Sequence, residues 1–194
     1  MVADRGQAHT LEAVVAALLL LTSVVFALQI TAVTPLSAST SNQHIENQQQ
    51  ASAAGALSMA HESGALEESI LYWNTSGDRF HGATPNGYYT RTMSTAFGEI
   101  LERSFGERGI AYNVNLIYAT DGGGVGREEM IYRGVPSDNA VVTTRTVVLT
   151  DDDRIRRANM TEGDRVNETG FYAPDVGDGG YYNTIRVEVV VWRI

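Results

Sequence analysis

An uncharged apolar run near the N-terminus constrains this chain more than any other feature. From Ala13 to Val33, 21 residues carry no charged side chain and are mostly Ala, Val, Leu and Ile. Because a helix rises about 1.5 Å per residue, roughly 20 residues cross the hydrocarbon core of a bilayer. A chain of 194 residues can hardly cover such a helix on all sides. We therefore expect this segment to enter a membrane.

Three interpretations of the run remain open. The run is a secretory signal cleaved near Ser37-Ala38-Ser39, or an uncleaved membrane anchor. The third interpretation takes the run together with the residues before it as one signal. Those residues, 4–12, read Asp-Arg-Gly-Gln-Ala-His-Thr-Leu-Glu. A charged leader, a glycine, a few polar residues and a lone Glu12 thus stand directly before the apolar helix.

This order resembles the class III signal of type IV pilin-like proteins. The segment Thr10-Leu11-Glu12-Ala13-Val14-Val15 is also similar to the start of bacterial pilins and tight-adherence pseudopilins. The resemblance implies that a prepilin-type peptidase cuts on the cytoplasmic side, after Gly6, and leaves Gln7 as the new N-terminus. A cut after Gln7 instead makes Glu12 the fifth residue, as in the bacterial pattern. Both positions stay open.

Glu12 has a physical role apart from the resemblance. A carboxylate at the bilayer centre costs a few kcal/mol, whereas at the membrane edge it stays hydrated. In a filament of side-by-side helices it can pair with the α-amino group of a neighbouring subunit. The alternative is that Glu12 only marks the interfacial end of an anchor. Arg5 alone precedes the run, which weakly favours a cytoplasmic N-terminus and an extracellular C-terminal domain.

The net charge and the choice of basic residues indicate which partners are unfavourable and in which environment the protein works. The formal charge is −9, from 14 basic and 23 acidic residues, and an acidic chain is a poor partner for nucleic acid. Every basic residue is arginine, and the chain has neither lysine nor cysteine. This composition is typical of a protein from a high-salt environment, and a mildly acidic mesophilic protein is the alternative. With the high-salt interpretation, the resemblance points to a haloarchaeal pilin-like protein. Absent cysteine excludes disulfides and thiolate metal sites.

The rest of the chain predicts an α+β fold. We expect a leader at 1–6, a membrane or filament-core helix at 7–34, a stalk helix at 35–73 and an exported α+β domain at 74–194. The stalk is expected to be kinked or briefly broken near Pro35. The exported domain is predicted to have one helix, at about 92–107 with Gly109 as its stop, and four strands forming an antiparallel sheet packed on the stalk. The four predicted strands are Ile110–Ala119, Met130–Arg133, Ala140–Leu149 and Thr184–Arg193. The last is expected inside the sheet or closing it, because an exposed edge so apolar invites aggregation.

No residue pattern predicts catalysis, a cofactor or a metal. The glycine-rich stretch 121–127 lacks the lysine of a phosphate-binding loop, and we interpret it as a turn between strands. Asp151-Asp152-Asp153 lacks the spacing of a calcium loop and is interpreted as a solvated turn. The four histidines are scattered without ligand spacing. We expect a protein that is not an enzyme.

Three sequons mark candidate glycosylation sites, at Asn74, Asn159 and Asn167, all in predicted loops. The leading hypothesis is a structural subunit of a type IV pilus-like surface filament, or a minor priming or capping component, involved in adhesion. Its partners are then membrane lipid, the prepilin-type peptidase and other pilin-like subunits. The alternative is a single-pass, membrane-anchored surface binding protein that does not polymerise.

Overall fold

The computed structural model describes the backbone of residues 3–194 and the side chains of residues 9–29, 43–106 and 108–194. It divides the chain into two compact units, Met1–Ile45 and Glu46–Ile194. We call the second unit the head domain. One helix, α1 (Ala3–Glu62), runs from the first unit into the head domain. It is continuous through Pro35, so a brief break there, one of the two expectations, is wrong.

The stalk prediction placed the end of the first helix too late. α1 ends at Glu62, and Gly64 adopts a φ of 77°, in the left-handed region where glycine is favoured. A separate short helix, α2 (Ala65–Ile70), then begins. The predicted single helix to Trp73 is therefore wrong in its last turns, because Gly64 in the left-handed region interrupts the helix.

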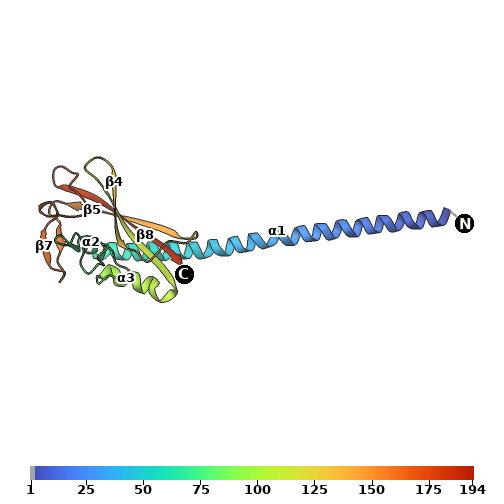
Figure 1. Ribbon diagram of the computed structural model, residues 1–194, viewed down its shortest axis with the longest axis horizontal. Helices are drawn as coiled ribbons and strands as arrows, with labels where there is room; N and C mark the ends of the chain where they lie inside the picture. Colours follow the sequence, from blue (N-terminus) through green and yellow to red (C-terminus); the bar gives the residue numbers. More distant parts are fainter. Residues whose placement is uncertain (1–2) are drawn as a thin grey trace. The chain divides into compact units, whose positions relative to one another are not determined.

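A four-stranded antiparallel sheet forms the centre of the head domain (Figure 1). Its order is β4-β3-β8-β5, with β3 at Ile110–Ala119, β4 at Val125–Ile131, β5 at Val141–Thr150 and β8 at Tyr181–Arg193. The C-terminal strand β8 lies between β3 and β5, which confirms its predicted interior position. β4 begins five residues before its predicted start.

The remaining elements are short. Two two-stranded sheets pair β1 (Trp73–Asn74) with β2 (Arg79–Phe80), and β6 (Arg154–Arg156) with β7 (Glu162–Arg165). None of these four was predicted, because strands of two to four residues carry too little periodic signal. Single 3₁₀ turns occupy Gly106–Arg108 and Val166–Glu168.

The helix α3 (Ala96–Phe105) lies inside the range predicted for it. The Thr95 hydroxyl accepts a hydrogen bond from the Gly98 N–H and caps the first turn, so the helix starts later than Thr92. Gly109 at a φ of 64° ends the 3₁₀ turn that follows, which confirms it as the stop.

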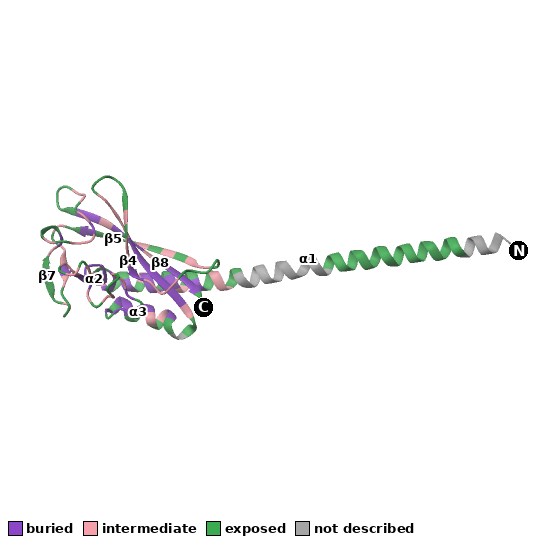
Figure 2. Cartoon of the chain, viewed as in Figure 1, coloured by how far each residue is buried: buried purple, intermediate pink, exposed green. Residues whose placement is uncertain are grey.

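One face of the sheet packs against the helices and holds the main core. Ala53, Ala56, Leu57 and Ala60 bring α1 into this core, and Phe97, Leu101 and Phe105 bring α3 into it. These residues recur every three or four positions, so each helix buries one stripe. Figure 2 shows the buried residues gathered where these helices meet the strands. The sheet-on-helix prediction is confirmed.

The opposite face of the sheet is partly covered by the segment after β4. Trp192 and Val190 are buried there with Ala111, and Ala140 packs against them. The Asn113 side chain holds this segment: its Nδ2 donates to the Gly134 carbonyl at 2.9 Å and its Oδ1 accepts from the Arg133 N–H at 2.8 Å. Farther along this face Ile117 is half-buried, and Val142, Thr144, Thr146 and Val148 of β5 are exposed.

Candidate functional site: an exposed apolar helix and two depressions of the head domain

The first half of α1 presents apolar side chains on every side. Residues 9–29 are all exposed, and the stretch His9–Gln29 is long and apolar enough to cross a bilayer (Figure 2). Between about half and two thirds of each large apolar side chain is accessible here, for example 68% of Leu20 and 65% of Phe26. Such a surface is unfavourable in water, as is usual for a membrane anchor or a signal sequence.

Thr22 and Ser23, in the middle of the apolar stretch, are compatible with an apolar surrounding. The Thr22 hydroxyl donates to the Leu18 carbonyl at 2.9 Å, and the Ser23 hydroxyl donates to the Leu20 carbonyl at 2.8 Å. Back-bonding of this kind satisfies a hydroxyl within its own helix. Neither side chain therefore opposes burial in lipid or between helices.

Glu12 lies at the N-terminal edge of this surface. Its side chain is 80% exposed, and its Oε2 is 3.7 Å from Nδ1 of His9, three residues earlier. This contact is an ion pair when the imidazole is protonated. The contact between His9 and Glu12 was not predicted, although their spacing of three residues places both side chains on one face of the helix. The predicted cleavage residues, Gly6 and Gln7, lie outside the part of the chain whose side chains are described.

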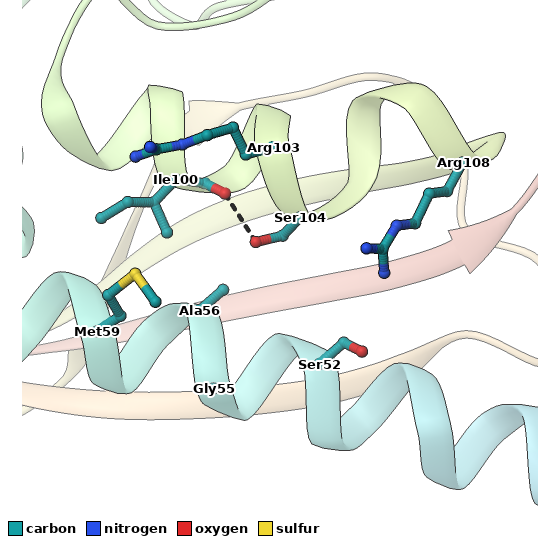
Figure 3. Close-up of a pocket in the computed structure, with 8 residues that line it drawn as sticks. All are labelled: Ser52, Gly55, Ala56, Met59, Ile100, Arg103, Ser104 and Arg108. Carbon is teal, nitrogen blue, oxygen red and sulfur yellow. Dashed lines mark hydrogen bonds between the residues drawn. The ribbon is translucent and has the colours of Figure 1, made fainter.

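A groove of about 400 Å³ separates α1 from α3 within the head domain (Figure 3). The α1 side of the groove is formed by small residues and one methionine, and the other side carries two arginines. The lining residues are Ser52, Gly55, Ala56, Met59, Ile100, Arg103, Ser104 and Arg108. Ser104 donates to the Ile100 carbonyl, and Arg103 Nε donates to the Glu99 carbonyl. Among the described residues neither arginine has an ion-pair partner.

A second depression, of about 570 Å³, lies where β3 ends. It is bordered by Asp121 in the β3–β4 turn and by Asp175 in the segment before β8. The Asp175 carboxylate already accepts the Gly177 N–H at 3.1 Å. Residues 120–124 connect β3 and β4, so the first part of the glycine-rich stretch is a turn as predicted, whereas residues 125–127 belong to β4 and the turn prediction is wrong for them.

The acidic run after β5 also has a local structural role. The Asp153 carboxylate accepts the Thr150 N–H at 2.6 Å and the Thr150 hydroxyl at 3.0 Å, which closes the turn. In the described ranges no three His, Cys, Asp or Glu side chains gather as metal ligands.

The three sequons differ in accessibility. Asn159 and Asn167 are exposed, in a turn and in a 3₁₀ turn respectively. Asn74 lies in strand β1, not in a loop as predicted, and it is half-buried with its Oδ1 accepting the Ser76 N–H. The Asn159 Oδ1 also accepts hydrogen bonds, from the Thr161 N–H and hydroxyl, so the three asparagines differ mainly in exposure.

These observations define a class of protein: an α+β domain continuous with an N-terminal apolar helix long enough to span a membrane. Helices of this kind occur in membrane anchors and in signal sequences. The chain belongs to a family described as a family of unknown function (DUF7288), whose model matches residues 5–191. No curated protein and no solved structure matches the chain.

Proposed function

We propose that this protein is a type IV pilin-like subunit of a surface filament, or a minor priming or capping component of one. The supporting observation is α1 itself. One helix carries an apolar surface exposed on all sides at residues 9–29, and its last turns, from Ala53 to Ala60, are packed into the head domain. Such an element links an exported domain directly to a membrane or to a bundle of helices.

In this proposal the helix exchanges lipid for other helices during assembly. Lipid tails are as apolar as Leu, so the driving force is van der Waals packing between helix faces and not the hydrophobic effect. Glu12 is exposed at the edge of that surface, where it can meet the α-amino group of a neighbouring copy. The N-terminus is cytoplasmic and the head domain is extracellular, where it mediates adhesion.

Mass spectrometry of the mature N-terminus tests the proposal directly. The full chain is isolated from cells with and without the prepilin-type peptidase. We expect a free terminus at Gln7 or Ala8 only when the peptidase is present. An intact Met1 in both strains, or a cut beyond Ser37, would overturn the proposal.

A Glu12 substitution tests the pairing role separately. Glu12→Ala is expected to reduce entry into surface filaments about tenfold or more, because an unpaired α-amino group is then left among packed helices. His9→Ala serves as the control, since it removes the neighbour of Glu12 but not the carboxylate. Normal filament entry of the Glu12→Ala chain would exclude the pairing role.

A membrane-anchored binding protein that does not polymerise is the second candidate. The groove between α1 and α3 favours it, because Arg103 and Arg108 border an apolar depression without an ion-pair partner among the described residues. An uncleaved chain whose Arg103→Ala, Arg108→Ala variant loses a surface ligand would support this candidate.

A further inference from the structure

Both outer strands of the main sheet have a free edge in the part of the chain that the structure describes. On β5, no backbone group of Val141–Leu149 bonds to any described residue outside β8. On β4, Tyr89 covers only the end of the strand, where its N–H donates to the Met130 carbonyl and its carbonyl accepts the Tyr132 N–H. The backbone of Val125–Glu129 bonds only to β3. Free edges are templates for pairing with another strand.

The residues whose backbone groups point outward follow from the hydrogen-bond alternation. The Thr120 N–H donates to the Gly124 carbonyl, so Thr120 and Gly124 form a hydrogen-bonded pair. Bonded and non-bonded pairs alternate along antiparallel strands, so Val125, Arg127 and Glu129 direct their N–H and C=O groups away from β3.

The same alternation applies to β5. The Ile194 N–H donates to the Gly109 carbonyl, which fixes the pattern along β3 and β8. The β8 residues that do not bond to β3 bond to β5, and the β5 residues between those bonded positions direct their N–H and C=O groups to the free edge. These residues are Val142, Thr144, Thr146 and Val148.

The two edges carry opposite charges on the same face of the sheet. Arg145 shares the helix-covered face with Val147 and Leu149, and it is half-buried without an ion pair or side-chain hydrogen bond among the described residues. Glu128 shares that face with its partner Leu116, and it too is half-buried and lacks a described cation. Burial and the nearby Asp78 carboxylate raise the pKa of Glu128, as expected where no cation compensates the charge.

We propose that β5 of one copy pairs antiparallel with β4 of a second copy, with Arg145 opposite Glu128. That register joins the free edges through Thr144–Glu129, Thr146–Arg127 and Val148–Val125, each of which presents backbone groups outward. It also brings together the exposed valines Val148 and Val125, whose side chains are 57% and 75% accessible in the single chain. Charge, backbone direction and apolar contact thus agree in one register.

The direction of the strands suits this contact. In the order β4-β3-β8-β5 all neighbours are antiparallel, so β4 and β5 run in opposite directions. A second copy that continues the sheet therefore meets β5 with an antiparallel strand. Since the two surfaces differ, the contact is heterologous, and each copy retains one free edge for another. The inference goes beyond the proposed function, because it concerns head domains and does not depend on the apolar helix.

Cysteine cross-linking between full-length copies tests the contact, since the natural chain has no cysteine. One copy carries Val125→Cys and a second, differently tagged copy carries Val148→Cys; both are expressed in the same cells and treated with a thiol oxidant. We expect a disulfide-linked species that bears both tags. Val148→Cys copies alone are expected to give about tenfold less, because a heterologous contact does not place this residue against itself.

Two controls make the result specific. Val135→Cys, 80% exposed in the segment after β4, replaces Val125→Cys and is expected to give no product above the background. Arg145→Glu in the Val148→Cys copy is expected to lower the yield about fivefold, and Glu128→Arg in the Val125→Cys copy to restore it. Equal yield with Val135→Cys, no product with both tags, or no restoration by the charge exchange would overturn the proposal.

Discussion

Two glutamates of the head domain have opposite electrostatic environments. Glu102 Oε2 accepts hydrogen bonds from the Thr92 hydroxyl at 2.8 Å and from Arg133 Nη2 at 3.0 Å, and these bonds hold the pKa of its carboxyl below the ordinary 4.5. The same guanidinium lies 4.0 Å from the centre of the Tyr112 ring. Glu128 has no such partner among the described residues, and its burial raises its pKa.

We expect Glu102→Gln to lower the free energy of unfolding by about 0.5–1 kcal/mol at pH 7, a small value because the side chain is 41% exposed. The folded-state pKa is below the unfolded one, so the stabilisation is complete above pH 4.5 and disappears as the pH falls through the lowered value. Chemical denaturation of the detergent-solubilised chain at pH 7 and at pH 3 measures this. If Glu102→Gln lowers the free energy of unfolding as much at pH 3 as at pH 7, the stabilisation does not come from the ionised Glu102 carboxylate.

Glu128→Gln is expected to have the opposite sign at pH 7. Its folded-state pKa lies above the unfolded one, so the charged form destabilises the fold at neutral pH, and the penalty declines as the pH falls. We expect a gain of about 0.5–1 kcal/mol at pH 7, measured in the same way on the dilute, unassociated chain. The exposed Glu168→Gln is the matched control and should change stability little. A destabilised Glu128→Gln chain would contradict the prediction.

At the scale of elements, the joint between α1 and α2 depends on one backbone angle. Gly64 has a φ of 77°, whereas Gly55 lies within α1, and a Cβ added at either position meets no atom within 4 Å. The two glycines therefore differ in backbone conformation and not in available space.

Alanine at these two positions is expected to act in opposite directions. Gly55→Ala should stabilise the chain by about 0.5–1 kcal/mol, because alanine is the better helix former. Gly64→Ala should destabilise it by about 1 kcal/mol, because an L-residue in the left-handed region is strained. Thermal unfolding of both variants measures the difference. Equal changes in the unfolding temperature of the two variants would show that the backbone conformation of Gly64 does not determine where α1 ends.

At the scale of the whole molecule, the division into two units predicts that the head domain is independent. The main core draws every member from residues 53–191, and no described core residue belongs to the apolar stretch His9–Gln29. Most of the exposed large apolar side chains of the described chain also lie in that stretch, outside the head domain.

A chain starting at Gln43 is therefore expected to be soluble without detergent and to unfold in one cooperative transition. Circular dichroism should show a mixture of helix and strand, and light scattering at low concentration should show a monomer. The full chain without detergent or lipid is the comparison, and it is expected to aggregate. A truncated chain without a cooperative transition would show that the head domain needs the first part of α1.

The sequence determined those features that depend on local patterns. The run Ala13–Val33 predicts a helix for an apolar surrounding from hydrophobicity alone, and the alternation in Ile110–Ala119 predicts β3 with its observed bounds. The apolar C-terminal strand indicated an interior position, because such a strand is a poor edge. These signals lie within about ten to twenty consecutive residues, so no partner needs to be known.

Only the tertiary structure decided which distant groups meet. The contact of Arg133 with Glu102 and Tyr112, and the lack of a described partner for Arg145 and Glu128, depend on chain segments far apart in sequence. The end of α1 at Glu62 and the short strand pairs are local, but their sequence signals are too short to predict. A single side chain carries no sequence signal about what it will face across a sheet or a helix. For that reason the sequence predicted an apolar helix and a sheet, whereas the free edges of that sheet became visible only once its strand order was known.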